Sequence, residues 1–348
     1  MPRPLKLILV GFEYGHQAAY GGLLADHATV ELIGVCRCTA DGETSISRGR
    51  EFARSRGCPY LEKLDRALEE LKPDVASLAL PPADNVGIAL GLIRRGIHVL
   101  CEKPVAPDAE GARLLVEAVE HHRVRFTWAL ATALFTRPIH DALELAKSGA
   151  LGTLRIVNYR FLQPKGPIFA NRTRETGGEF ANFGAYGWVP LTRLVPYPLA
   201  TVFSMQRSLF YENYKREGID DLSITTLRFK GGAIGTLTVG RIPVESMPST
   251  DLRLELIGSE GVVQVKNGMG DALHVWEPFK GAPGEFERGA FTREPVNDAA
   301  AKLFVDDFVA AILEGREPVL SAGDALSFAR LCAAAERSSR ERKVVAFE

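Results

Sequence analysis

Short apolar runs alternate with amphipathic stretches in the first third of the chain, and this alternation constrains the fold more than any other feature. The runs are rich in β-branched residues and poor in polar ones, and they span residues 7–10, 30–35, 75–80, 98–101 and 124–130. Buried parallel strands have this composition because crossover helices cover both of their faces. The sequence therefore predicts a doubly wound parallel sheet of the dinucleotide-binding type.

The pattern changes near residue 130. A helical segment over 137–147 is followed by longer segments in which apolar residues alternate with polar ones, at 154–162, 222–229, 233–239 and 252–257. The Gly231-Gly232 pair between two of these segments suits a hairpin turn. Two further helical stretches follow, over 300–314 and 322–340. We expect a dinucleotide-binding domain over residues 1–130 and a second domain with a mainly antiparallel sheet over residues 131–348.

Composition indicates a small-molecule partner. The 42 Lys and Arg residues nearly balance the 43 Asp and Glu residues, and the basic residues are spread along the chain. Nucleic-acid binding is disfavoured, because it needs clustered positive charge. The five cysteines form no ligand-like cluster, and the sequence has neither a signal peptide nor an apolar run of membrane-spanning length. No metalloprotease, phosphate-loop or serine-hydrolase motif occurs. We therefore expect a cytoplasmic protein that contacts no membrane and binds no metal.

The turn after the first apolar run is the first candidate cofactor site. A dinucleotide fingerprint has glycine at its first, third and sixth positions, so that the backbone turns tightly and approaches the pyrophosphate. Gly11 is the only glycine in register. Glu13 and His16 occupy the other two glycine positions, and Gly15 is displaced by one residue. The helix that follows can still favour a phosphate through its exposed N–H groups. An ordinary strand-to-helix turn is the alternative.

Arg37, which follows the second apolar run, bears on the choice of cofactor. An acidic residue at this place accepts hydrogen bonds from the adenosine ribose of NAD, whereas an arginine suits the 2′-phosphate of NADP. The position favours NADP over NAD, with Ser45, Ser47 and Arg48 as candidate further contacts. A solvated surface arginine is the alternative.

The segment Glu102-Lys103-Pro104 carries the strongest functional signal. Lys103 follows the apolar run at 98–101, and the carboxyl ends of parallel strands border the crevice in which doubly wound sheets bind ligands. Pro104 restrains Lys103 to an extended backbone conformation. The lysine could act as an acid or base, or it could orient a hydroxyl or carbonyl oxygen.

These motifs resemble those of the Gfo/Idh/MocA family, named for glucose-fructose oxidoreductase and inositol dehydrogenase. The resemblance extends from about residue 5 to residue 345 and rests on Glu102-Lys103-Pro104, on Pro81-Pro82 ahead of Asn85, and on segments 149–152, 220–221, 258–261 and 307–318. Membership implies a nicotinamide-binding Rossmann domain and an open-faced, mainly antiparallel α+β domain for substrate binding and oligomerisation. We therefore expect a homodimer or homotetramer formed through the C-terminal sheet. The expected cofactor contacts are Gly11, Phe12, Glu13, Gly15, His16, Arg37, Leu80, Pro81, Pro82, Asn85, Glu102 and Lys103.

The family's second active-site motif places an aspartate and, four residues later, a histidine on one helix face. Asn182 stands in the aspartate place and Tyr186 in the histidine place, and their i, i+4 spacing keeps them on one face. Tyrosine there resembles the glucose-fructose oxidoreductase branch and can relay a proton. With an ordinary pKa of about 10, it needs a nearby cation such as Lys103 to ionise at neutral pH. Asn182 can hydrogen-bond a substrate hydroxyl but cannot take up a proton. A substrate-binding group without acid–base function and a core residue are the alternatives for Tyr186.

Trp128, Arg160 and Arg172 are further candidates for substrate binding. Trp128 could stack on a nicotinamide or sugar ring, although a buried core tryptophan explains it equally well. Arg160 belongs to the first long segment of the second domain, and Arg172 lies between Asn171 and Arg174 ahead of a glycine pair. Their charges would suit a carboxylate or phosphorylated substrate, and a solvated loop is the alternative.

The sequence thus predicts an NAD(P)-dependent oxidoreductase that moves hydride between the nicotinamide and a hydroxyl- or carbonyl-bearing carbon of a sugar, polyol or derivative. Lys103, Tyr186 and Asn182 are the predicted catalytic residues, with Lys103 and Tyr186 at the reacting oxygen. Two alternatives keep the fold and change the role. One is a non-catalytic sensor or regulator that binds the cofactor or a sugar, and the other is an enzyme that performs redox-neutral chemistry on glycosides.

Overall fold

The chain divides into two compact units. The computed structural model describes residues 3–38, 42–164, 173–174, 176–243, 250–266, 273–276 and 296–347. One unit comprises Met1–Ala129 and Ala301–Ala329, and the other comprises Leu130–Ala300 and Arg330–Glu348. The first unit is therefore discontinuous, because it includes residues 301–329, which a single division at residue 130 assigns to the second domain.

The first unit is built on a six-stranded parallel sheet with strand order β3-β2-β1-β4-β5-β6. This is the order of a doubly wound dinucleotide-binding sheet, so the predicted fold class is confirmed. The strands are β1 (Leu5–Val10), β2 (Val30–Cys36), β3 (Tyr60–Leu61), β4 (Val75–Leu78), β5 (His98–Cys101) and β6 (Phe126–Trp128). The two-residue strand β3 is missing from the apolar pattern of the sequence because it is too short to produce one.

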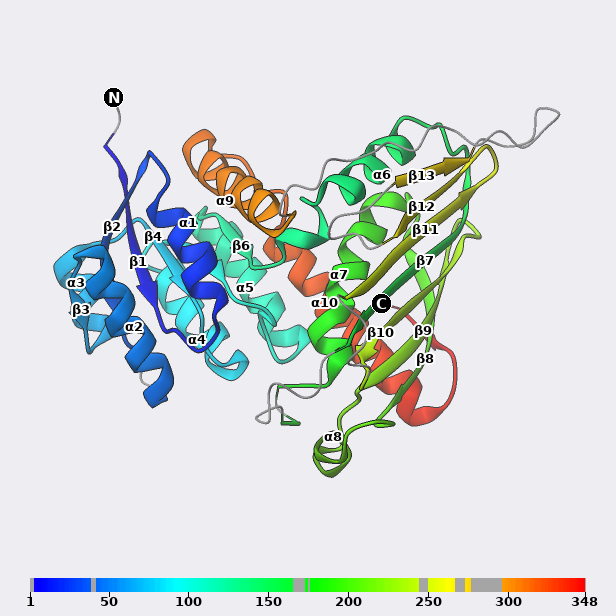
Figure 1. Ribbon diagram of the computed structural model, residues 1–348, viewed down its shortest axis with the longest axis horizontal. Helices are drawn as coiled ribbons and strands as arrows, with labels where there is room; N and C mark the ends of the chain where they lie inside the picture. Colours follow the sequence, from blue (N-terminus) through cyan, green and yellow to red (C-terminus); the bar gives the residue numbers. More distant parts are fainter. Residues whose placement is uncertain are drawn as a thin grey trace. The chain divides into compact units, whose positions relative to one another are not determined.

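Helices flank this sheet, as Figure 1 shows. They are a π-helical turn η1 (Gln17–Gly21), α1 (Gly22–Ala25), α2 (Glu43–Arg56), α3 (Leu64–Leu71), α4 (Pro82–Ile93) and α5 (Ala109–His122). Their ends follow local chemistry. The Asp108 carboxylate caps α5 by accepting the Gly111 N–H at 2.7 Å, and α3 ends immediately before Lys72-Pro73. The side chains of Leu7, Ile8, Leu9 and Val10 are fully buried, which accounts for the apolar run at this place.

The second unit is built on an eight-stranded sheet with strand order β13-β12-β11-β7-β10-β9-β8-β14. Its strands are β7 (Leu154–Gln163), β8 (Leu199–Arg207), β9 (Leu222–Phe229), β10 (Ile234–Arg241), β11 (Asp251–Gly258), β12 (Val262–Lys266), β13 (Leu273–Trp276) and β14 (Val345–Ala346). Only β7 and β10 pair in parallel among these described strands. The predicted mainly antiparallel sheet is confirmed.

One face of this second sheet is covered and the other is open (Figure 1). The unit contains η2 (Ala131–Ala133), α6 (Arg137–Lys147), α7 (Glu179–Leu194) and α8 (Glu212–Glu217). α7 packs on β7 and β10, and α6 packs on β12 and β13. Tyr159 and Leu237 lie on the covered face and are buried, whereas Asn158 and Thr236 on the opposite face are only partly buried. The covered face therefore holds the core of this unit.

The last two helices, α9 (Val296–Glu314) and α10 (Ala322–Glu341), each begin in one unit and end in the other. In the second unit, the end of α10 is joined to β8 because the Ser204 N–H donates to the Ser338 hydroxyl at 3.0 Å. Across the described residues, every helix is too short or too polar to span a membrane.

Candidate functional site

The turn after β1 is held by three different parts of the first unit. Gly11 has a φ of +72°, which favours glycine because a side chain is strained there. The N–H groups of Gly11 and Glu13 donate to the carbonyls of Cys36 and Ala79, both at 3.0 Å. Between them, the Phe12 N–H donates to the Ser45 hydroxyl at 2.8 Å. The turn is thereby attached to β2, β4 and α2, so it keeps its shape without the other two fingerprint glycines.

Ser45 was expected to be a candidate contact for a 2′-phosphate, but the structure gives it a different place. Its side chain is buried, and its hydroxyl accepts the Phe12 N–H. The buried Phe12 ring packs against Phe52 with ring centres 5.3 Å apart. Ser45 therefore positions the turn from α2.

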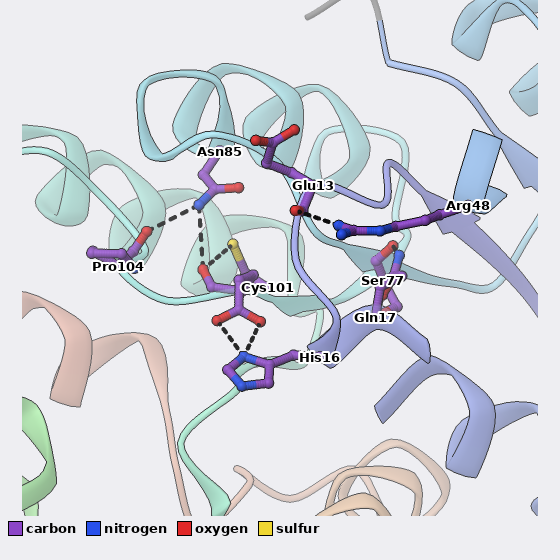
Figure 2. Close-up of polar contacts among 9 residues, drawn as sticks. Glu13, His16, Gln17, Arg48, Ser77, Asn85, Cys101 and Pro104 are labelled. Atoms are coloured by element: carbon purple, nitrogen blue, oxygen red, sulfur yellow. Dashed lines mark hydrogen bonds and ion pairs between the residues drawn. The ribbon is translucent and has the colours of Figure 1, made fainter. Parts of the chain in front are cut away.

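Gln17 completes this turn, and sequence reasoning missed it. Its buried side-chain NH2 group donates to the Gly11 carbonyl at 3.1 Å. It also donates to the Ser77 carbonyl at 2.9 Å, and its side-chain oxygen accepts the Ser77 hydroxyl at 2.7 Å; Gln17 and Ser77 are the adjacent labelled residues in Figure 2. Gly15 lies two residues earlier, and no atom approaches within 4 Å of the place where its Cβ would be. A lone glutamine carries no sequence signal of such a role, because a solvated glutamine looks the same.

His16 joins the turn to the segment that contains Lys103. Its Nδ1 lies 3.1 Å from both carboxylate oxygens of Glu102. Figure 2 marks these two contacts as dashed lines from the labelled His16 ring. The Glu102 side chain is only 3% exposed, whereas that of His16 is 52% exposed. Burial of a carboxylate is costly unless it has a polar partner, and the imidazole supplies one. The structure thus brings together two predicted cofactor residues, and the contact was not visible in the fingerprint.

Asn85, the fourth residue of α4, holds the loop around Lys103. Its fully buried amide nitrogen donates to the carbonyl oxygens of Glu102 at 3.3 Å and Pro104 at 3.0 Å (Figure 2). The Lys103-Pro104 peptide bond is cis, and Lys103 itself is partly buried. The helix that carries Asn85 begins at Pro82, and Pro81 is its N-cap. Leu80, the residue before the N-cap, is buried. The loops after β4 and β5 are therefore joined at the carboxyl edge of the sheet.

Arg37 lies at the end of β2 next to a carboxylate. Its Nη1 is 3.7 Å from Glu62 Oε2, and Arg50 Nη2 is 2.8 Å from Glu62 Oε1. Arg50, with a smaller contribution from Arg37, lowers the pKa of Glu62. Arg48 lies nearby in sequence and donates to the Glu13 carbonyl at 3.3 Å. Glu62 thus partly offsets the positive charge that Arg37 would present to a 2′-phosphate.

The start of α7 is tightly packed against the segment before β9. Asp220 accepts the Glu179 N–H through its carbonyl at 2.9 Å and the Phe180 N–H through its carboxylate at 2.8 Å. A carboxylate at this end of a helix is favourable because the first N–H groups have no partner within the helix. At Gly178 a Cβ would lie 2.0 Å from an Asp220 carboxylate oxygen, so only glycine fits. These contacts fix where α7 begins.

A buried carboxylate lies within the first turn of α7. Glu179 is fully buried, and its Oε1 accepts the Arg241 Nε–H at 3.0 Å as well as the Tyr214 hydroxyl. Its Oε2 accepts from the Asn182 amide at 2.8 Å. Sequence reasoning found Asn182 but missed the other three residues. Arg241 did carry a signal, because it shares the inward alternation of Leu237 and Val239 on β10.

Tyr186 lies one helical turn after Asn182. Its ring stacks on Phe161 of β7 with centres 5.0 Å apart and planes inclined by 14°. The neighbouring Tyr159 is buried, and its burial, with a smaller effect of Tyr186, raises its pKa. Tyr186 is partly buried, so this phenol is the more accessible of the two.

Arg160 does not join Asn182 and Tyr186. Its Nε lies 2.9 Å from Asp251 Oδ2, and it borders a depression of about 320 Å³ on the open face of the sheet. Successive side chains of a strand point to opposite faces, and the next residue, Phe161, is the one that stacks on Tyr186. Arg160 therefore lies on the face of the sheet opposite to the side chain that stacks on Tyr186, and its role in substrate binding stays a prediction.

Of the two remaining residues expected to contact the substrate, Trp128 is buried and Arg172 is not described by the structure. Trp128 is 1% exposed and donates its indole N–H to the Ser321 carbonyl at 3.1 Å, which favours its interpretation as a core residue. Arg172 and Asn171 lie outside the described residues. The main-chain N–H of Arg174 donates to Glu217 at 3.3 Å.

Both units match domains of one family. Residues 5–130 match an oxidoreductase family domain with an NAD-binding Rossmann fold, and residues 139–264 match the GFO/IDH/MocA C-terminal domain. A myo-inositol 2-dehydrogenase from Thermotoga maritima is 24% identical over 72% of this chain and 73% of its own length. A D-glucoside 3-dehydrogenase from Escherichia coli is 24% identical over 53% of this chain, which spans about half (52%) of that relative.

Solved structures share the whole architecture. An oxidoreductase domain protein from Kribbella flavida has a TM-score of 0.83 at 21% identity and covers 100% of both chains. GenD2 from gentamicin A biosynthesis, solved in complex with NAD, has a TM-score of 0.82 at 22% identity and covers 100% of this chain and 97% of that one. At these identities the likeness establishes a common fold.

Proposed function

The chain belongs to the Gfo/Idh/MocA family of oxidoreductases, and we propose that it transfers hydride between a nicotinamide cofactor and a carbon bearing a hydroxyl or carbonyl group on a sugar, polyol or derivative. One observation carries the proposal: Gly11, at the turn after β1, and Lys103, at the end of β5, both lie at the carboxyl edge of a doubly wound sheet. This edge is where such sheets bind ligands. Two named relatives act on inositol and on glucosides, which supports the substrate class.

The residues of the first unit suit a dinucleotide. The backbone at Gly15 is open to close approach, since nothing lies within 4 Å of the place of a Cβ. The turn from Gly11 to His16 would hold the pyrophosphate, and the loop around Lys103 would border the nicotinamide. When bound, the nicotinamide supplies or accepts the hydride. We propose NADP as the preferred cofactor because of Arg37, with NAD as the alternative because Glu62 offsets the arginine's charge.

The proposed roles of the catalytic residues follow from their chemistry. The Lys103 ammonium group would orient the reacting oxygen and stabilise negative charge on it. The Tyr186 side chain, ionised as phenolate beside the Lys103 cation, would take up the proton of that oxygen during oxidation, and the phenol so formed would return the proton during reduction. Asn182 would hold a neighbouring hydroxyl by hydrogen bonding, because its amide cannot exchange a proton.

For its assembly, we propose a homodimer or homotetramer formed through the open face of the second sheet. This face exposes the apolar side chains of Met205, Ile224 and Ile234. Met205 and Ile224 are directly paired on β8 and β9, so they form one continuous apolar area. Burial of such an area against a second copy would be favourable.

Cofactor titration combined with a Lys103→Met variant tests the proposed function. NADPH and NADH are titrated by nicotinamide fluorescence, and a panel of sugars and polyols is then assayed for a change in nicotinamide absorbance. We expect NADPH to bind more tightly than NADH, and Lys103→Met to lower kcat/KM by about 100-fold or more at unchanged thermal stability. Lys147→Met, at an exposed site on α6, is the matched control and should behave as wild type.

Two results would contradict the proposal. Failure of both NADPH and NADH to bind in the micromolar range would contradict the proposed nicotinamide-binding site. Tight cofactor binding without turnover of any sugar or polyol would favour a sensor.

A further inference from the structure

A buried carboxylate lies three residues before Asn182 on α7. The family resemblance places an aspartate at the position of Asn182, which bears no charge. A carboxylate does occur three residues earlier, at Glu179, and the two side chains are hydrogen-bonded at 2.8 Å. Residues three apart on a helix are neighbours on its surface, so this contact is built into α7 itself.

Glu179 is fixed on both of its oxygens. Oε1 receives the Arg241 Nε–H and the Tyr214 hydroxyl, and Oε2 receives the Asn182 amide N–H. Glu179, Arg241 and Tyr214 are each no more than 1% exposed. An ionised carboxylate only accepts hydrogen bonds, and all three partners are donors. The buried arginine also balances its charge, so the carboxylate is stabilised as an acceptor.

We propose that Glu179 is a positioning residue that sets the orientation of the Asn182 amide. The inference rests on the proposed function, in which Asn182 binds a substrate hydroxyl. With the amide nitrogen held toward Glu179, the carbonyl oxygen of Asn182 is turned to the other side. The reverse orientation would place that oxygen against Glu179 Oε2, where two acceptors repel each other. Asn182 is thereby presented to the substrate as an acceptor, so it selects a hydroxyl that donates.

With Asn182 in place of an aspartate, the substrate hydroxyl would meet a neutral amide oxygen instead of a charged carboxylate. An aspartate at position 182 would bring a second carboxylate next to Glu179, and like charges at that distance disfavour ionisation of both. The amide avoids the repulsion and still offers an oxygen. Glu179 and Asn182 therefore act as a pair, and a change at one position is tolerated only with a matching change at the other.

A Glu179→Gln variant tests the pair. The glutamine oxygen can still accept from Arg241 and Tyr214, so its NH2 group faces Asn182 and turns the Asn182 amide around. Asn182 would then offer a donor where the substrate hydroxyl also donates. We expect kcat/KM for the polyol substrate to fall about 10- to 100-fold, chiefly through KM, with unchanged cofactor affinity.

The double variant Glu179→Gln/Asn182→Asp reverses this change. The aspartate would accept from the glutamine NH2 with one oxygen and present the other oxygen to the substrate. We expect it to recover about tenfold or more of the kcat/KM lost in the single variant. Ser204→Ala is the structural control, because it removes a buried 2.7 Å hydrogen bond to Thr225 in the same unit. It should lower thermal stability with little effect on KM.

Two outcomes would overturn the inference: equal effects of Glu179→Gln and Ser204→Ala on KM, or a double variant no better than the single one. If the wild type turns over no sugar or polyol, the proposed function fails. The orientation of the Asn182 side-chain amide is then tested by NMR, without any substrate. In protein labelled with ¹⁵N-asparagine, the Asn182 side-chain NH2 signals should be protected from hydrogen exchange. They should shift in Glu179→Gln but not in Ser204→Ala, and unchanged signals would contradict the assignment.

Discussion

Buried polar side chains organise the candidate cofactor site at the scale of single residues. Gln17 and Asn85 are each no more than 2% exposed; Gln17 donates to three main-chain carbonyls and Asn85 to two. The Gln17 bonds join the turn after β1 to β4, and the Asn85 bonds join α4 to the loop after β5. Leaving buried carbonyls without a donor costs about 1–3 kcal/mol per group, so these two side chains are difficult to replace.

His98 is a single residue with a defined effect on stability. Its Nδ1 accepts the Arg125 N–H at 2.8 Å, which requires that this nitrogen carry no proton and hence that the imidazole be neutral. Burial, with a smaller effect of the Arg125 charge, lowers the pKa of His98 from 6.5 to about 4. Between these values the unfolded chain binds more protons than the folded protein. The free energy of unfolding should therefore be unaffected above pH 6.5 and fall as the pH drops from 6.5 toward 4.

We expect this loss to reach on the order of 2–3 kcal/mol. Urea denaturation at several pH values through this window measures it. In a His98→Asn variant, the asparagine oxygen can still accept from Arg125 but does not titrate. The variant should lose less stability on acidification than wild type, and an identical pH dependence would contradict the assignment to His98.

At the scale of elements, the close approach of α7 to the sheet determines where Asn182 and Tyr186 lie. Gly187 makes this approach possible. A Cβ at this position would lie 2.4 Å from the Tyr159 ring and 2.9 Å from Leu237. Tyr159 is buried on β7 and Leu237 on β10, so neither has room to move. A larger residue would push the helix away from the sheet.

Two glycine-to-alanine variants test this packing. Both glycines lie inside helices, where alanine has the higher helix propensity. At Gly87 of α4 no atom lies within 4 Å of an added Cβ, so Gly87→Ala should raise the free energy of unfolding by about 0.5–1 kcal/mol. Gly187→Ala should lower it by about 1–3 kcal/mol because of overpacking. Thermal and urea denaturation give both values, and shifts in the same direction would exclude the proposed contact.

At the scale of the whole molecule, the open face of the second sheet is the surface most suited to a second copy of the chain. Ile224 is 41% exposed and Met205 is 49% exposed, and their side chains are cross-strand neighbours. A charge placed there would have to be buried on association, which is unfavourable.

An Ile224→Asp variant tests the proposed assembly. Light scattering coupled to size exclusion should give a dimer or tetramer for wild type and a lower mass for the variant. Leu313→Asp is the control, because Leu313 is equally apolar and 51% exposed but lies on α9. It should keep the wild-type mass. A monomeric wild type, or a variant of unchanged mass, would remove the case for this interface.

The sequence by itself determined the kind of sheet in each unit and the positions of Gly11 and Lys103. These features depend on periodicity over a few residues and on glycine and proline geometry, both of which are local. Only the tertiary structure decided which side chains meet. Glu102 and His16 are 86 residues apart, and Glu179 and Arg241 are 62 apart. Such contacts depend on strand order, register and burial, which no local pattern contains. For the same reason, the sequence did not reveal that Arg160 and the neighbouring Phe161, which stacks on Tyr186, lie on opposite faces of the sheet.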